Sequence, residues 1–135
     1  MKGYLLREQD IVPGEDTFIE CLADMNSNGV VFEDNTDTGF FYAIEKDPTS
    51  GEMRVLDALH IYNAEDITDK QKRALKIIWS KSWQQCALVI DTYCYALFDF
   101  AGHGGYNRNE FPPPNEFWTR HGRKLTSEVI SSFFE

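Results

Sequence analysis

The stretch Cys86–Phe100, CALVIDTYCYALFDF, decides the fold. Two runs of apolar and aromatic residues flank Asp91-Thr92, a pattern that predicts a β-hairpin with a two-residue turn. Both faces of the hairpin are apolar, so we expect it to lie in the middle of a sheet that is covered on both sides. In the expected register, Ile90 faces Tyr93, Leu88 faces Tyr95 and Cys86 faces Leu97, with Ala87, Val89, Cys94, Ala96 and Phe98 on the opposite face.

Working outward, further strand-like runs precede the hairpin and are separated by turn signals. The turns are Asn26–Gly29 and Asp47–Gly51, and the polar segment Glu33–Thr38 forms the acidic tip of a second hairpin. Ala64–Lys72 is polar and is expected to form a loop or a single helical turn. The predicted strands are Thr17–Leu22, Val30–Phe32, Gly39–Ile44, Met53–Tyr62 and Ala74–Ser80.

The character of the chain changes after Phe100. Ala101–Tyr106 is rich in glycine and is expected to be a flexible loop, and the prolines of Phe111–Pro114 cannot donate hydrogen bonds to a sheet. Thr126–Phe134 predicts a short helix whose apolar stripe covers one sheet face. That stripe consists of Val129, Ile130, Phe133 and Phe134. The expected fold class is α+β: a predominantly antiparallel β sheet, a meander of about six to seven strands, with a short C-terminal helix, in a single domain over residues 1–135.

Negative charge is concentrated in the first half of the chain. Residues 1–66 contain 15 Asp and Glu against 4 Lys and Arg, a balance of −11, whereas residues 67–135 contain 7 against 9, a balance of +2. Such a surface repels nucleic acid and anionic lipid, and it accelerates the encounter with a cationic protein. The charge pattern therefore argues against nucleic-acid and membrane binding and favours a basic protein partner.

The N-terminus and the cysteines indicate a cytoplasmic protein. Arg7, Glu8 and Asp10 interrupt the only apolar patch near the N-terminus, so it does not form a signal peptide. The apolar runs elsewhere, about five residues long, are far shorter than the roughly 20 residues of a membrane-spanning helix. The three cysteines, Cys21, Cys86 and Cys94, have no C-x-x-C spacing, and Cys86 and Cys94 fall on opposite faces of the predicted hairpin. We therefore expect buried free thiols.

The motifs that carry chemistry are weak. Glu33–Gly39 places acidic and hydroxyl side chains near the spacing of a calcium loop, but strand-like runs flank it and an acidic hairpin tip is the preferred interpretation. The histidine His103 lies in a glycine-rich segment that matches no phosphate-binding motif. The carboxylates Asp57, Asp91 and Asp99 are expected to serve turns and backbone rather than hydrolysis. We expect no catalytic residue, no metal and no cofactor.

Several stretches together resemble a known bacterial family. They are Val30–Asp34, Thr38–Ala43, Leu56–Asn63, Ile77–Ser80 and Ala96–Phe100. The chain resembles a group of short, acidic bacterial proteins that are classified only as a domain of unknown function. The resemblance spans about residues 13–118 and leaves the predicted C-terminal helix outside it. The resemblance implies a bacterial source, but no activity is known for the family that could be assigned to this chain. Small acidic bacterial proteins of this kind often resemble immunity proteins.

These observations lead to one principal hypothesis and two alternatives. The principal hypothesis is an immunity-type binding protein that neutralises a basic, nuclease-like toxin domain. Its contact residues are Glu33, Asp34 and Asp37, with outer steering charges at Glu15, Asp16, Glu65 and Asp66. The first alternative is a small-ligand-binding protein or enzyme with a pocket formed by His103, Tyr106 and Arg108. The second is an accessory or oligomeric protein that uses exposed aromatic residues as an interface.

Overall fold

The computed structural model describes residues 3–114, 118 and 122–134. Within this part of the chain, nine strands are followed by one helix, and a 3-10 turn separates the fifth strand from the sixth. The elements are β1 (Gly3–Ile11), β2 (Thr17–Leu22), β3 (Asn28–Asp34), β4 (Thr38–Lys46), β5 (Met53–Asn63), η1 (Ala64–Asp66), β6 (Arg73–Ser80), β7 (Gln85–Ile90), β8 (Tyr93–Asp99), β9 (Gly104–Asn107) and α1 (Ser127–Phe134). The expected class, predominantly antiparallel β with one short C-terminal helix, is confirmed.

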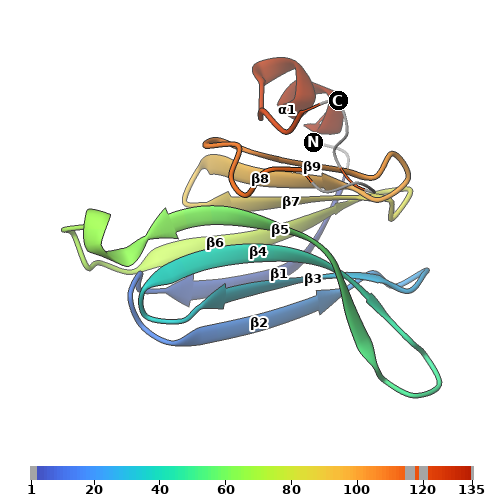
Figure 1. Ribbon diagram of the computed structural model, residues 1–135, viewed down its shortest axis with the longest axis horizontal. Coiled ribbons are helices and arrows are strands. Elements are labelled where there is room, and N and C mark those ends of the chain that lie inside the picture. The colour runs from blue at the N-terminus through green and yellow to red at the C-terminus, as the bar shows by residue number, and fades with distance from the viewer. Residues whose placement is uncertain (1–2, 115–117, 119–121, 135) are drawn as a thin grey trace.

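The strands form two antiparallel sheets that pack face to face (Figure 1). One sheet has the order β2-β3-β4-β5 and the other has the order β1-β6-β7-β8-β9. Each sheet is a meander, except that β1 joins the second sheet beside β6. All the strand-connecting turns therefore lie at two opposite ends of the sandwich. The turns after β1, β3, β5 and β7 meet at one end, and those after β2, β4, β6 and β8 meet at the other.

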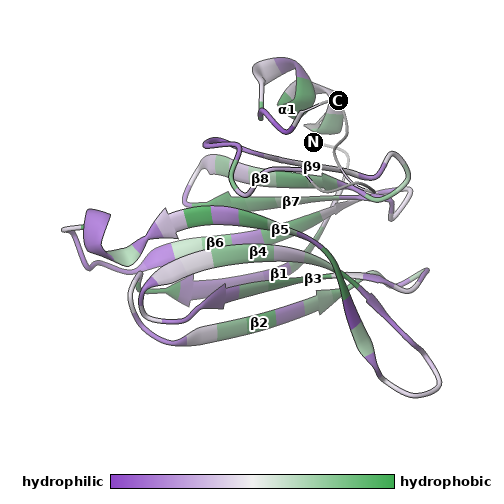
Figure 2. Cartoon of the chain, viewed as in Figure 1, coloured by the Kyte–Doolittle hydropathy of each residue, from purple (hydrophilic) through white to green (hydrophobic). Residues whose placement is uncertain are grey.

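The core lies between the sheets because alternate residues of each strand point inward. Ile19, Phe32 and Phe41 from the four-stranded sheet pack with Leu75 and Leu88 from the five-stranded sheet, and all five are fully buried. The strands β7 and β8 are hydrophobic along most of their length (Figure 2). This agrees with their position inside the five-stranded sheet, where both of their faces are covered.

The second face of the five-stranded sheet is covered by α1, as the sequence predicts. Phe133, Val129 and Ile130 pack on a small apolar cluster formed by β6, β7 and β8. The members that the strands contribute are Ile78, Ala87, Val89, Cys94 and Leu97. The Phe134 side chain lies outside the described residues. The helix lies above β8 and β9 in Figure 1.

Two strands are missing from the sequence-based prediction. In β1 the alternation of apolar and polar residues is irregular. Charged residues lie on its exposed face, and a bulge between Leu5 and Arg7 shifts the alternation by one residue. In β9 two of the four residues are glycine, and the sequence predicts a flexible loop there. Gly105 is required by packing: a Cβ there would lie 2.8 Å from the Phe98 ring. The expected loop Ala101–Tyr106 is therefore wrong at residues 104–106, which belong to β9.

The predicted turn of the central hairpin is confirmed, but its register is only partly correct. Asp91 adopts φ 58°, as a tight two-residue turn requires, and Ile90 faces Tyr93. A bulge between Leu88 and Val89 then shifts the pairing by one residue, so that Leu88 faces Ala96 rather than Tyr95. Cys86 accordingly faces Phe98 rather than Leu97. Ala96 and Phe98 therefore point into the core, and Leu97 points toward the helix.

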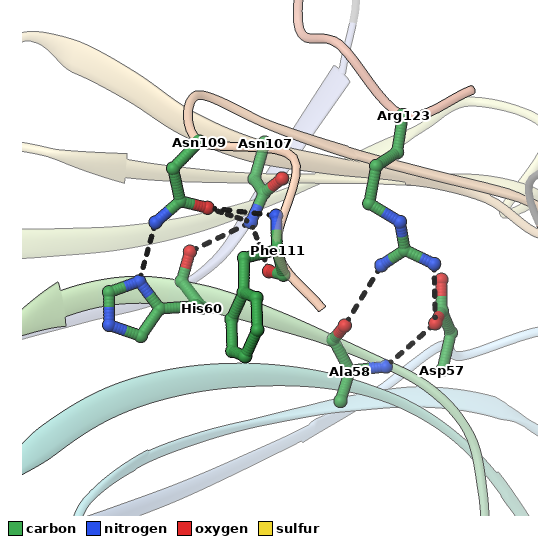
Figure 3. Close-up of polar contacts among 7 residues, drawn as sticks. All are labelled: Asp57, Ala58, His60, Asn107, Asn109, Phe111 and Arg123. Atoms are coloured by element: carbon green, nitrogen blue, oxygen red, sulfur yellow. Dashed lines mark hydrogen bonds and ion pairs between the residues drawn. The ribbon is translucent and has the colours of Figure 1, made fainter. Parts of the chain in front are cut away.

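Strand β5 and the segment after β9 tie the two sheets together (Figure 3). The His60 backbone N–H donates to the Phe111 carbonyl at 3.0 Å. Asn107 Nδ2 donates to the carbonyls of His60 at 2.8 Å and Phe111 at 2.9 Å. Further along β5, Arg123 reaches Asp57 and Ala58. The sandwich is thus closed along the side formed by β5 and β9.

Candidate functional site

Three segments that are distant in the sequence meet at one end of the sandwich and enclose a hollow. They are the β1–β2 turn, the β3–β4 turn and η1. The hollow has a volume of about 640 Å³. Three of the predicted partner-binding residues line it, one from each segment: Glu15, Asp37 and Glu65. We refer to this cavity as the acidic hollow.

Asp34 supports the acidic hollow from behind. Its side chain is 1% exposed, so the sequence-based expectation that it contacts a partner is wrong. Oδ2 accepts hydrogen bonds from the Gly14 N–H at 2.8 Å and from the Tyr62 hydroxyl at 2.6 Å, and Oδ1 accepts one from the Thr36 N–H at 2.8 Å. The carboxylate therefore links the β1–β2 turn, the β3–β4 turn and β5.

The absence of a side chain at Gly39 allows Tyr62 to reach Asp34. Gly39 pairs with both Asp34 and Tyr62, and a Cβ at position 39 would lie 2.7 Å from the Tyr62 ring. The Tyr62 ring can therefore lie across Gly39 and bring its hydroxyl to the Asp34 carboxylate. Burial, the hydrogen bond to Asp34 and the charge of Asp34 all raise the pKa of Tyr62. Tyr62 consequently remains a neutral donor at physiological pH.

The rim of the hollow has one basic residue. The Lys70 ammonium group donates to the carbonyl of Ala64, the first residue of η1, at 2.7 Å. Thr36, also on the rim, adopts φ 82°, an unusual conformation for a β-branched residue. The hydrogen bond from its N–H to Asp34 holds it in that conformation. Three carboxylates and one lysine therefore line the hollow.

The remaining predicted acidic residues lie at different distances from the hollow. Asp16 and Asp66 are exposed beside it, and Asp66 accepts a hydrogen bond from Asn63 at 3.2 Å. Glu33 belongs to β3, on the outer face of the four-stranded sheet. The sequence-based prediction makes Glu33 and its loop neighbours the contact residues and the other acids outer steering charges. The structure instead gathers Glu15, Asp37 and Glu65 around the hollow and separates Glu33 from them.

The residues of the alternative pocket do not share a site, so that prediction is wrong as a set. His103 lines a hollow of about 610 Å³ at the opposite end of the sandwich, and its ring stacks on Trp118 with centroids 5.3 Å apart. Tyr106 packs toward α1. The Arg108 guanidinium lies 4.4 Å from the Tyr93 ring centroid and donates to the Cys94 carbonyl.

Sequence reasoning missed a row of aromatic residues on the outer face of the four-stranded sheet. Phe40 and Tyr42 are stacked with centroids 5.9 Å apart, and Phe40 meets the His60 ring edge-on at 5.4 Å. Phe18 lies two strands away on the same face and is 59% exposed. The signal that could reveal this row is the alternation of Phe40 and Tyr42 with buried residues along β4.

No three or more His, Cys, Asp or Glu side chains within residues 3–114, 118 and 122–134 are grouped so that they could hold a metal ion. No helix in the same part of the chain is long and apolar enough to cross a membrane.

Comparison with known proteins gives a family but no activity. An uncharacterized protein from Haemophilus influenzae (strain ATCC 51907 / DSM 11121 / KW20 / Rd) is 39% identical over 94 residues, which is 67% of this chain and 57% of that protein. The chain therefore spans less than two thirds of the length of this relative. No solved structure matches. A family match covers residues 11–134, so it includes the C-terminal helix that the sequence-based resemblance left out. The chain belongs to the family described as an uncharacterized protein conserved in bacteria (DUF2251).

Proposed function

We propose that this chain is a binding protein for a basic protein partner. In its most concrete form, it is a cytoplasmic immunity-type protein that neutralises a nuclease-like toxin domain. The observation that carries the proposal is the convergence of Glu15, Asp37 and Glu65 on one hollow from three separate segments. A basic partner is favoured because the hollow offers three carboxylates and one lysine.

The charge distribution of the whole molecule supports the same partner class. The segment 17–63, which contains the four-stranded sheet, has nine Asp and Glu against two Lys and Arg, a balance of −7. A field of one sign over this part of the molecule steers an oppositely charged protein into productive encounter. Carboxylates on a rigid rim resemble the phosphates that a nuclease binds, so they can occupy a basic active site. This resemblance to phosphate is why a nuclease-like toxin is the specific form of the proposal.

The experiment compares two triple variants that remove the same amount of charge. The first carries Glu15→Gln, Asp37→Asn and Glu65→Gln at the acidic hollow. The matched control carries Glu8→Gln, Glu52→Gln and Glu128→Gln, which are exposed acids elsewhere. Tagged protein captures partners from a lysate of the encoding bacterium at about 50 mM and about 500 mM salt, and mass spectrometry identifies them. The association rate of the captured partner is then measured with each variant.

The expected result is one stoichiometric basic partner that is held at low salt and released at high salt. The hollow variant should associate on the order of tenfold more slowly than the wild type, and the control variant should associate at nearly the wild-type rate. Equal slowing of both variants would mean that net charge, and not the hollow, governs binding. Capture of no basic partner at either salt would overturn the proposal.

A second candidate function is favoured by the hollow at the opposite end. This is a small-ligand site or an active site, supported by the His103–Trp118 stack beside the apolar side chains of Leu56 and Phe100. Its volume is in the range of small-molecule sites. A small-molecule library is screened by ligand-observed NMR against the wild type and His103→Ala. A compound bound by the wild type and lost in the variant, with unchanged thermal unfolding, would support it. Identical binding by both proteins would contradict it.

A further inference from the structure

The outer face of the four-stranded sheet is apolar although the described helix covers only the other sheet. The apolar side chains on this face that reach the surface are Phe18, Leu22, Phe40, Tyr42 and Val55, and the buried Val31 lies beneath them. Val55 is 56% exposed, Phe18 is 59% exposed and Leu22 is 37% exposed. An antiparallel sheet that faces water normally carries polar residues on that side. A contiguous apolar face therefore indicates an interaction surface.

Two carboxylates lie on this face: Glu20, which is paired with Lys46, and Glu33, which lies between aromatic residues. In the register of the sheet, Glu33 on β3 is directly opposite Phe18 on β2 and directly opposite Phe40 on β4. Side chains at directly opposite positions have Cβ atoms about 5 Å apart. The row across the sheet therefore reads Phe18, Glu33, Phe40, with the His60 ring next in line on β5.

Glu33 has no partner among the residues that the structure describes. Glu20 differs in this respect. It lies on β2, two residues after Phe18, and its carboxylate accepts a hydrogen bond from the Lys46 ammonium group at 3.0 Å. The charge of Glu33 affects the neighbouring Tyr42. Burial raises the pKa of Tyr42, and the Glu33 carboxylate raises this pKa further. An unpaired carboxylate between aromatic rings is a site for a cation that also has a flat apolar surface.

We propose that the outer face of the four-stranded sheet docks an arginine-bearing segment of the basic partner, with the guanidinium hydrogen-bonded to Glu33 and stacked on Phe18 or Phe40. Arginine fits better than lysine because its planar group bonds a carboxylate in a two-point fork and stacks on a ring at the same time. The chain makes such a stack internally, where Arg108 lies 4.4 Å from the Tyr93 ring centroid.

The charge of the sheet selects a different protein over a second copy of this chain. Face-to-face packing of two copies would bring together two sheets that each carry a balance of −7 over residues 17–63. Like charges across an interface disfavour association. The docking surface rests on the proposed function, because it supplies the holding contact for the same basic partner that the acidic hollow attracts. The two sites meet at the β3–β4 hairpin, which carries both Glu33 and Asp37.

The test uses a blocked peptide of alternating arginine and leucine as the probe and follows backbone amide shifts by NMR. The matched peptide contains citrulline in place of arginine, which preserves shape and removes charge. The protein variants are Glu33→Gln and Phe40→Ala at the docking surface, Asp37→Asn at the hollow and Glu8→Gln as an exposed control. The sedimentation coefficient of the free protein is measured over a range of concentrations to detect self-association.

The expected result is shifts of amides in β2, β3 and β4, with the arginine peptide bound at least about tenfold more tightly than the citrulline peptide. Glu33→Gln should weaken binding by a similar factor, Phe40→Ala should weaken it several-fold, and Glu8→Gln should leave it unchanged. Shifts confined to the acidic hollow, with loss of binding in Asp37→Asn only, would overturn the docking surface and leave the proposed function standing. Absence of arginine-dependent binding anywhere would overturn both. Equal binding of the citrulline peptide, or a dimer that Phe40→Ala dissociates, would overturn the choice of a cationic partner.

Discussion

Arg123 and Asp57 form an ion pair in the interior, with Arg123 Nη2 3.1 Å from Asp57 Oδ1. The two side chains are 1% and 4% exposed. Arg123 Nη1 also donates to the Ala58 carbonyl at 3.0 Å, so one guanidinium holds both the carboxylate and the backbone of β5 (Figure 3). The pair is 66 residues apart in the sequence and fixes the segment before α1 to the four-stranded sheet.

Removing one member of this pair should be strongly destabilising. Arg123→Met leaves the Asp57 carboxylate buried without its guanidinium partner, so we expect the free energy of unfolding to fall by about 3–5 kcal/mol. The matched control is Arg54→Met, because Arg54 forms an exposed ion pair with Glu45. That variant should lose less than about 1 kcal/mol. Urea unfolding measures both variants, and losses of similar size would contradict a special role for the buried pair.

The sequence was sufficient to predict the strands whose two faces are both buried. Cys86–Ile90 and the strand after it were recognised because a continuous apolar run leaves few alternatives. In contrast, β1 and β9 were missed. β1 is an edge strand with an exposed, charged face, and half of the residues of β9 are glycine. The tertiary contacts of these strands, and not their composition, therefore make them strands.

The candidate site was predictable in composition but not in geometry. Glu15, Asp37 and Glu65 were identified from charge alone, and only the fold brings their three segments around one hollow. Asp34 could not be distinguished from Glu33 in the sequence. By strand alternation these neighbours point to opposite faces, so that one is buried beneath the hollow and the other lies among aromatic rings. A shift of the strand by one residue would exchange the two positions, so the register determines that Asp34 is the structural acid and Glu33 the acid on the outer face of the sheet.

The contact between Tyr62 and Asp34 should make stability fall at alkaline pH. The pKa of Tyr62 is raised in the folded protein by burial and by Asp34, whereas an unfolded tyrosine ionises near pH 10. The unfolded chain therefore loses this proton first, and the contribution is complete below pH 10 and declines by about 1.4 kcal/mol per pH unit above it. Urea unfolding at increasing pH should show a shallower decline in Tyr62→Phe than in the wild type. Tyr4→Phe, at a half-exposed tyrosine, serves as the control and should decline like the wild type.

The three cysteines should react slowly in the native protein. Cys21, Cys86 and Cys94 are free and buried, which agrees with the sequence-based expectation. Burial raises the pKa of all three thiols, that of Cys94 to about 11, so little reactive thiolate is present at pH 8. A colorimetric thiol reagent should therefore detect well under one thiol per chain within minutes in buffer and three in denaturant. Rapid reaction of a full thiol in buffer would contradict the burial of these side chains.

At Asn107, replacing only the amide nitrogen by oxygen should lower the free energy of unfolding more than removing the whole side-chain amide. Its Nδ2 donates to three oxygens, the carbonyls of His60 and Phe111 and the side chain of Asn109, and the residue is fully buried. Asn107→Ala leaves these acceptors without a donor and should cost about 1–3 kcal/mol.

Asn107→Asp has nearly the same shape but directs carboxylate oxygen toward three acceptors, so its cost at pH 7 should exceed that of the alanine variant. Protonation restores one donor, and the deficit should therefore shrink as the pH is lowered toward 4. Urea unfolding of both variants across that pH range tests the order. A smaller loss in the aspartate variant than in the alanine variant at pH 7 would mean that the amide nitrogen is not the atom that joins β5 to the segment after β9.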